Sequence, residues 1–355
     1  MVQFILIFCN KFAKTIEATL LSSTAAHAPS DARERHTMKI AFVGKGGSGK
    51  TTVSSLFIRH LGTIGKTIVA IDADINQHLG TALGLSEAEA ADIPALGANI
   101  HRLKDYLRGN NPRISSADAM LKTTPAGRGS RLLRMGEDDL FHQDFSVQVA
   151  GATLMVTGPF AEEDLGVACY HSKVGAAELY LNHVLDGPDD YVVMDMTAGA
   201  DAFASGLFTR FDITFLVAEP TRKGVSVYRQ YKEYARKHNV KILVIGNKVE
   251  DADDEAFLRE AVGDDLLVCL SPSSYVRACE KGRSPGFATL ELHNRAALDT
   301  ILTAVNDTPQ DWEKFTRQGA EFHIRNALAW GNGRTGEDLS QQIDPDFVMG
   351  LNMSV

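Results

Sequence analysis

The stretch that most constrains this chain is GKGGSGKTT, residues 44–52, directly after the apolar run at 38–43. It fits the pattern G-x-x-x-x-G-K-[ST], with Gly44, Gly49, Lys50 and Thr51 at the fixed positions. Glycines let backbone N–H groups approach a phosphate closely, and a following helix adds a favourable dipole. A glycine-rich turn without a ligand is the competing interpretation, but the strand before the motif and the helix after it disfavour that. We therefore expect a nucleotide phosphate site here, which also includes Lys45, Gly46, Gly47, Ser48 and Thr52.

Short apolar runs alternate with helical stretches from residue 38 onward, the pattern of βαβ units. Because the runs are almost wholly apolar, we expect strands that helices cover on both faces. The predicted fold is a three-layer α/β fold with a mostly parallel sheet of about seven strands. The candidate strands are 39–44, 67–72, 153–158, 191–196, 213–219, 241–247 and 266–271, and a helix is expected from about Lys50 to Leu61.

The chain divides into three predicted parts. Residues 1–37 are a disordered or non-native leader, because the apolar run VQFILIF is too short to span a membrane and its basic residues follow it. Residues 38–305 form the nucleotide-binding domain, with an arginine-rich insertion at about 86–147. We read the insertion as a solvated loop, with a mobile lid or a partner surface as alternatives. In the tail, 306–355, Trp312, Phe315 and Gly319 recur at helical spacing and predict a core-facing helix.

Charge and cysteine content limit the environment. Lysine and arginine number 36 against 45 aspartates and glutamates, a net charge of −9, which argues against a surface that broadly binds nucleic acid or anionic lipid. The four cysteines form no C-x-x-C pair, so we expect a reduced, cytoplasmic setting without stable membrane insertion.

Lys45 is a second lysine, directly after the first glycine of the loop. Lys50 already supplies charge to the phosphates, and a side chain so near the start of the loop projects away from its own pocket. It can therefore reach a second molecule. The pattern K-G-G-x-G-K-[ST] resembles the deviant Walker A motif of the SIMIBI-class ATPases, the MinD/ParA/nitrogenase-iron-protein group. That resemblance implies ATP hydrolysis with Mg²⁺ and a homodimer in the ATP-bound state, in which Lys45 contacts the neighbour's nucleotide.

Further positions agree with that group. In VAIDAD, the resemblance implies that Asp74 positions the attacking water and that Asp72 supports the loop or the metal shell. Asp195, in VVMDM, matches the Walker B aspartate that holds the Mg²⁺ shell together with Thr51. In VIGNKV, Asn247 resembles the residue that reads adenine, and Lys248 follows it in the cofactor site.

Within the group, the chain is most similar to the CooC-type ATPases that assist nickel insertion into carbon monoxide dehydrogenase. The C-x-C pair of that type is replaced by Cys169 and His171. Two such pairs in a dimer would offer a Cys₂His₂ set for Zn²⁺ or Ni²⁺, and a metalloenzyme would be the client. A buried thiol beside a surface imidazole is the simpler reading of these residues. A ParA- or MinD-like positioning switch is the alternative function. A reductase is disfavoured because the segment after Asp195 has no cysteine.

Overall fold

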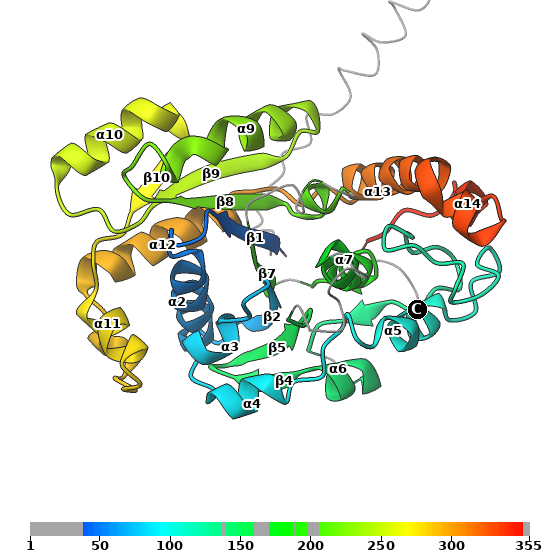
Figure 1. Cartoon of the computed structure of the whole chain (residues 1–355), viewed down its shortest axis with the longest axis horizontal. Coiled ribbons are helices and arrows are strands. Elements are labelled where there is room, and N and C mark those ends of the chain that lie inside the picture. Colours follow the sequence, from blue (N-terminus) through cyan, green and yellow to red (C-terminus); the bar gives the residue numbers. More distant parts are fainter. Residues whose placement is uncertain are drawn as a thin grey trace, which may run out of the picture. The chain divides into compact units, whose positions relative to one another are not determined.

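An eight-stranded sheet forms the centre of the chain (Figure 1). The computed structural model describes residues 38–136, 139–159, 170–187, 189–197, 203 and 206–350, without the side chains of 170–172 and 197. The strand order is β10-β9-β8-β1-β7-β2-β5-β4, and all neighbouring pairs are parallel except β4 with β5. The strands are β1 (Met38–Gly44), β2 (Thr67–Ala73), β4 (Val147–Val149), β5 (Ala152–Val156), β7 (Asp190–Thr197), β8 (Ile213–Ala218), β9 (Lys241–Gly246) and β10 (Leu266–Cys269). Two further strands, β3 (Leu133–Arg134) and β6 (Val184–Leu185), pair separately.

Helices cover both faces of this sheet. The helices of the described residues are α2 (Lys50–Thr63), α3 (Leu79–Ala82), α4 (Glu87–Ala91), α5 (Ile100–Arg108), α6 (Leu140–Phe145), α7 (Tyr170–Leu181), α9 (Tyr228–Lys237), α10 (Ala252–Val262), α11 (Ser274–Glu280), α12 (Leu292–Asn306), α13 (Trp312–Asn326) and α14 (Asn332–Thr335). The fold class expected from the sequence is confirmed. All seven candidate strands are present with ends within two residues of the prediction, and the sheet gains the short antiparallel strand β4 at its edge.

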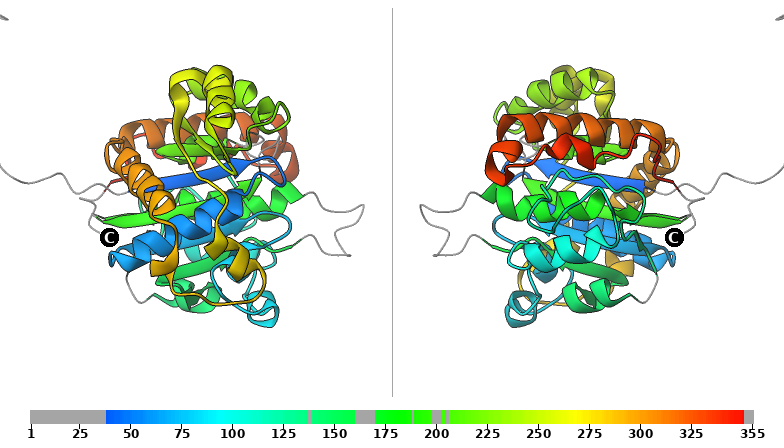
Figure 2. Two further views of the ribbon diagram at one scale, coloured as in Figure 1. Left: turned by 90° about the vertical axis from the view of Figure 1, so that its left-hand side faces the viewer. Right: turned by 90° about the vertical axis from the view of Figure 1, so that its right-hand side faces the viewer.

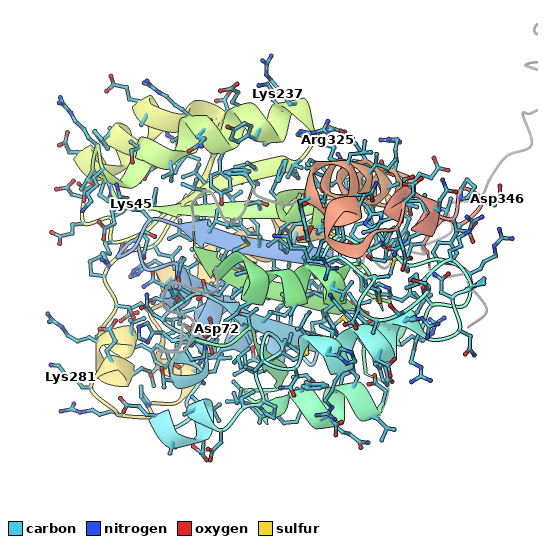
Figure 3. The ribbon with its side chains drawn as sticks, turned by 45° about the vertical axis from the view of Figure 1, so that its right-hand side comes forward. Lys45, Asp72, Lys237, Lys281, Arg325 and Asp346 are labelled. Carbon is cyan, nitrogen blue, oxygen red and sulfur yellow. The ribbon has the colours of Figure 1, made fainter. Side chains whose placement is uncertain are left out.

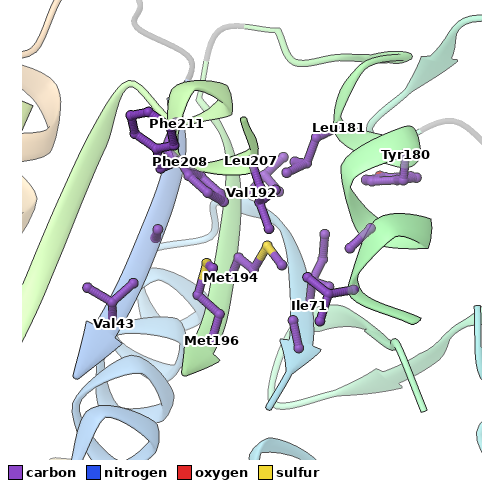
Figure 4. Close-up of a cluster of buried hydrophobic side chains, with 14 of the residues drawn as sticks. Val43, Ile71, Tyr180, Leu181, Val192, Met194, Met196, Leu207, Phe208 and Phe211 are labelled. Carbon is purple, nitrogen blue, oxygen red and sulfur yellow. The ribbon is translucent and has the colours of Figure 1, made fainter. Parts of the chain in front are cut away.

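Alternation along each strand separates two apolar cores. Val43 of β1 and Met194 of β7 face the core that α5, α7, α9 and α10 cover (Figure 4). Ile40 and Phe42 face the opposite core, which α2 and α12 cover. Because both faces of the central strands are buried, their sequences are apolar almost throughout, and this made them visible in the sequence.

The insertion is not the solvated loop that we expected. Ile114, Met120 and Leu121 are almost fully buried within it, and it contains helices α5 and α6. Ile114 and Met120 belong to the core that α5 and α7 cover, whereas Leu121 packs with Ala327 and Leu339 of the C-terminal tail, which lies beside the insertion (Figures 1 and 2). No local sequence pattern predicts the packing of the tail on the insertion, because the two segments are far apart along the chain.

Specific polar contacts join the tail to the insertion. Arg128 donates to both carboxylate oxygens of Asp344, at 2.7 and 2.9 Å. His323 of α13 lies 3.2 Å from the Thr123 hydroxyl through Nδ1 and 3.0 Å from the Leu339 carbonyl through Nε2. The tail and the insertion are therefore held together by these contacts.

Helix α13 also contacts the end of the sheet away from the phosphate loop. Trp312 and Phe315 stack against the buried Lys39 ammonium, which lies 4.3 and 5.1 Å from the two ring centres. The expected core-facing helix is therefore present, with Phe315 and Gly319 on its buried face. No helix in the described part of the chain is long and apolar enough to cross a membrane.

Candidate nucleotide site

The loop Gly44–Gly49 connects the carboxyl end of β1 to α2 and requires glycine at two positions. A Cβ on Gly44 would lie 2.4 Å from the Ser48 hydroxyl and 2.7 Å from the Val217 carbonyl oxygen. Gly49 has φ +84°, and a Cβ there would lie 2.1 Å from the Asn247 amide nitrogen. The loop can therefore wrap closely only because these side chains are missing.

Hydrogen bonds within the loop and from strand β9 fix the backbone of the loop. The Ser48 N–H donates to the Lys45 carbonyl at 2.9 Å, which closes a turn over Gly46 and Gly47. From the end of β9, the Asn247 amide donates to the Ser48 carbonyl at 2.8 Å. The structure thus brings Asn247 to the loop itself, and its role in reading the base stays a prediction.

Lys50 lies among the three acids that the sequence singled out. Its ammonium forms an ion pair with Asp74 and lies 3.7 Å from Asp195 Oδ1. Burial lowers the pKa of Lys50, but the Asp195 and Asp74 carboxylates outweigh it and raise the pKa above its ordinary value. Lys50 is therefore a full positive charge at the base of the loop.

Asp74 is an ionised acceptor. Burial raises its pKa, but the hydrogen bond from Lys50 and those from Asn76 dominate and hold the pKa below its usual range. The backbone N–H of Asn76 donates to Asp74 Oδ1 at 2.9 Å, which fixes the carboxylate. A carboxylate held in this way can accept a hydrogen bond from a water molecule.

Asp195 and Thr51 supply oxygen ligands of the kind that Mg²⁺ prefers. The Thr51 hydroxyl donates to Asp195 Oδ2 at 2.5 Å. The other oxygen, Oδ1, is buried and accepts no hydrogen bond. Burial raises the pKa of Asp195 to about 6. A cation there would stabilise the ionised carboxylate, so the residues present fit a magnesium ion.

Asp72 pairs in register with Asp195 across β2 and β7, and its side chain is fully buried. Its carboxylate accepts the N–H of Asp74 at 3.1 Å and of Leu79 at 2.8 Å. Burial, and then the nearby Asp195, raise the pKa of Asp72 to about 7. Of the two roles considered for Asp72, these contacts favour support of the loop that carries Asp74.

Lys45 lies at the outer edge of the molecule, whereas Asp72 lies in its interior (Figure 3). Among the described residues, no ion pair involves Lys45. Gly46 and Gly47 beside it are exposed. This end of the loop is therefore open to a second molecule.

The transition-metal site predicted at Cys169 and His171 lies largely outside the described residues. Cys169 is not described, and of His171 only the backbone, in helix α7, is described. Among the described side chains, no group of three histidines, cysteines or acids could hold a metal ion. Metal binding by Cys169 and His171 therefore stays a prediction.

One contact of the site escaped the sequence analysis. Glu219, directly after β8, pairs with Lys248, whose ammonium donates to the Gly47 carbonyl at 2.8 Å. Glu219 could have been found from the sequence, because it follows a predicted strand and the carboxyl ends of parallel strands meet at one edge of the sheet.

The glycine loop, its lysine and the acids at the ends of β2 and β7 define a P-loop nucleotide-binding protein. The chain belongs to the CobQ/CobB/MinD/ParA nucleotide-binding domain family, whose profile matches residues 40–267. It is a P-loop ATP hydrolase with the deviant Walker A motif.

Two proteins with similar sequences support the assignment to this family. Carbon monoxide dehydrogenase accessory protein CooC of Rhodospirillum rubrum is 28% identical over 248 residues, which cover 69% of this chain and 87% of the relative. An uncharacterised ATP-binding protein of Methanocaldococcus jannaschii is 29% identical over 230 residues, or 64% of this chain and 81% of the relative.

Solved structures give weaker similarity. The cell division ATPase MinD of Pyrococcus furiosus is 15% identical, with a TM-score of 0.46, over 76% of this chain and 100% of that chain. A ParA family ATPase of Chlorobium tepidum is 13% identical, with a TM-score of 0.49, over 76% of this chain and 98% of that chain.

Proposed function

We propose that this protein is a Mg²⁺-dependent ATPase that works as a nucleotide-switched homodimer in the maturation of a metallocentre. The similarity to an accessory protein of carbon monoxide dehydrogenase supports the class of client, a metalloenzyme. The chemistry of the loop supports the switch.

The contacts of Lys50 carry the proposal. Its ammonium is shared between Asp74 and Asp195, so a bound triphosphate competes with both carboxylates for the same cation. When the γ-phosphate takes Lys50, Asp74 loses its partner and its carboxylate is free to orient a water in line with the phosphate. Asp195 and Thr51 would hold a magnesium ion, which would supply positive charge beside the phosphates. Binding of ATP thereby changes the segment that follows Asp74.

Lys45 links this change to pairing. It is free of carboxylates among the described residues, and it stands on the open end of the loop. A second copy that approaches this end brings its own nucleotide within reach of the ammonium. Charge supplied in this way stabilises the transition state, as an arginine finger does.

The test compares Lys45→Ala with Lys50→Ala and with Lys237→Ala, a remote exposed lysine on α9. Light scattering measures the mass in the presence of Mg²⁺ and a non-hydrolysable ATP analogue. We expect a dimer for wild type and for Lys237→Ala. Lys45→Ala should bind the analogue yet stay monomeric and hydrolyse ATP slowly, whereas Lys50→Ala should lose binding. A Lys45→Ala protein with the wild-type hydrolysis rate would refute the switch.

The metal role has its own test. Purified wild-type protein is loaded with Zn²⁺ or Ni²⁺ and its metal content is measured. The double variant Cys169→Ser, His171→Ala should lose stoichiometric metal, whereas the control Cys279→Ser should keep it. Wild-type protein that retains no metal would exclude this client class while leaving the ATPase intact.

A ParA-like switch that binds DNA is the alternative, and helix α9 is the basic surface for it. Two of its basic side chains are already neutralised, since Lys232 pairs with Asp265 and Lys237 with Glu233. This weakens the case for DNA. ATP-dependent retention on DNA that decreases with salt would favour the alternative.

A further inference from the structure

Lys248 stands out because its backbone and its side chain are both unusual. It directly follows β9 and has φ +61°, a left-handed conformation that is uncommon for a residue with a Cβ. Its ammonium donates to the Gly47 carbonyl at 2.8 Å and pairs with Glu219. A long side chain in an unfavourable backbone conformation is thus directed to one carbonyl group of the phosphate loop.

Three consecutive carbonyl groups of the loop are held. Lys248 binds that of Gly47, Asn247 that of Ser48, and the Val53 N–H that of Gly49. In a trans peptide the carbonyl and the next N–H point in opposite directions. Holding these carbonyls therefore also fixes the directions of the N–H groups that follow them, including the Ser48 N–H that donates to the Lys45 carbonyl.

Lys248 controls one peptide in particular. The peptide between Gly47 and Ser48 has its carbonyl on Lys248 and its N–H on the Lys45 carbonyl, 2.9 Å away. The orientation of this peptide therefore sets the turn that carries Lys45. Gly46 and Gly47 are exposed and have no side chains that could pack. Among the described contacts, the two hydrogen bonds of this peptide therefore restrain the tip of the loop.

We propose that Lys248 and Glu219 form a latch that positions the phosphate loop, so that Lys248 acts through the Gly47 carbonyl rather than by contact with the nucleotide. Glu219 keeps the ammonium in place, because it accepts from the same Nζ atom and comes from the adjacent strand end after β8. The latch ties the ends of β8 and β9 to the loop after β1. It does not depend on the client or on a transition metal.

The experiment measures MgADP affinity by calorimetry, together with the urea midpoint of nucleotide-free protein. Lys248→Ala and Lys248→Gly both remove the ammonium, and the glycine variant also suits the positive φ, so a loss common to both comes from the latch. We expect each to weaken MgADP binding about tenfold, the scale of one charge-assisted hydrogen bond, without lowering the urea midpoint. Lys248→Arg should restore most of the affinity, and Lys223→Ala, which removes an exposed lysine four residues after Glu219, should change nothing.

Coupling to Glu219 gives the second arm. Glu219→Gln should weaken binding less than Lys248→Ala, and the double variant should be no weaker than Lys248→Ala alone, because the two side chains act in series. Unchanged MgADP affinity in Lys248→Ala and Lys248→Gly, or additive losses in the double variant, would overturn the latch. Wild-type protein that fails to bind MgADP would instead overturn the nucleotide function itself, so the two failures are distinct.

Discussion

His323 gives the sharpest prediction about stability, because it is buried between the insertion and the tail. One ring nitrogen faces the Thr123 hydroxyl and the other the Leu339 carbonyl. Burial lowers the pKa of His323 from 6.5 to about 4. The neutral ring is therefore the folded form, with Nε2 donating to the carbonyl and Nδ1 accepting from the hydroxyl.

The direction of the pH effect follows from linkage. The folded pKa lies below the unfolded value, so the stabilisation is fully present above pH 6.5 and is lost as the pH falls toward 4. The two pKa values differ by about 2.5, and each unit is worth about 1.4 kcal/mol, which gives a limit of about 3 kcal/mol. Between pH 7 and pH 4.5 most of this limit, about 2 kcal/mol, should be lost.

The assay is urea unfolding at pH 7 and pH 4.5 for wild type and His323→Gln. Glutamine can still donate to the Leu339 carbonyl but does not titrate. His183, whose pKa burial also lowers to about 4, is present in both proteins and cancels in the comparison. The wild type should lose about 2 kcal/mol more than His323→Gln on acidification. An equal loss in both would refute the assignment of the effect to this ring.

Three further outcomes are expected. Gly49→Ala should abolish MgADP binding in calorimetry, whereas Gly65→Ala, at φ +70° with open space around its Cβ, should keep it. Asp195→Asn should keep affinity for ATP without Mg²⁺ and lose the gain that Mg²⁺ gives in wild type; a preserved gain would exclude Asp195 from the metal shell. Trp312→Leu should cost about 2 kcal/mol in urea unfolding through lost packing and contact with Lys39, with MgADP affinity unchanged.

The sheet and the phosphate loop were predictable because each depends on a local pattern. Strands buried on both faces are apolar throughout, so β1, β2 and β7 could be recognised without knowledge of their neighbours. The loop was equally visible, since its glycines, Lys50 and Thr51 occur at fixed spacing within the short stretch 44–52. Because β2 and β7 are parallel neighbours, their carboxyl ends place Asp74 and Asp195 beside Lys50.

The insertion was not predictable in the same way. Its polar residues are satisfied from the far end of the chain, as Arg128 is by Asp344 and Thr123 by His323. Its arginines therefore resembled those of a solvated loop. Lys248 was placed in the cofactor site, but only the geometry shows that its ammonium reaches the Gly47 carbonyl, because a sequence does not reveal which way a loop's carbonyl groups point.

The partners of the phosphate loop and those of the insertion are made at different times during translation. Asp74, Asp195 and Asn247 have all left the ribosome well before Asp344, the residue that secures Arg128. Because chains emerge from the N-terminus, the site for ATP can assemble first, while the insertion waits for the segment that carries Asp344. A newly made chain therefore passes through a stage that can hold nucleotide before the insertion and the C-terminal tail are joined.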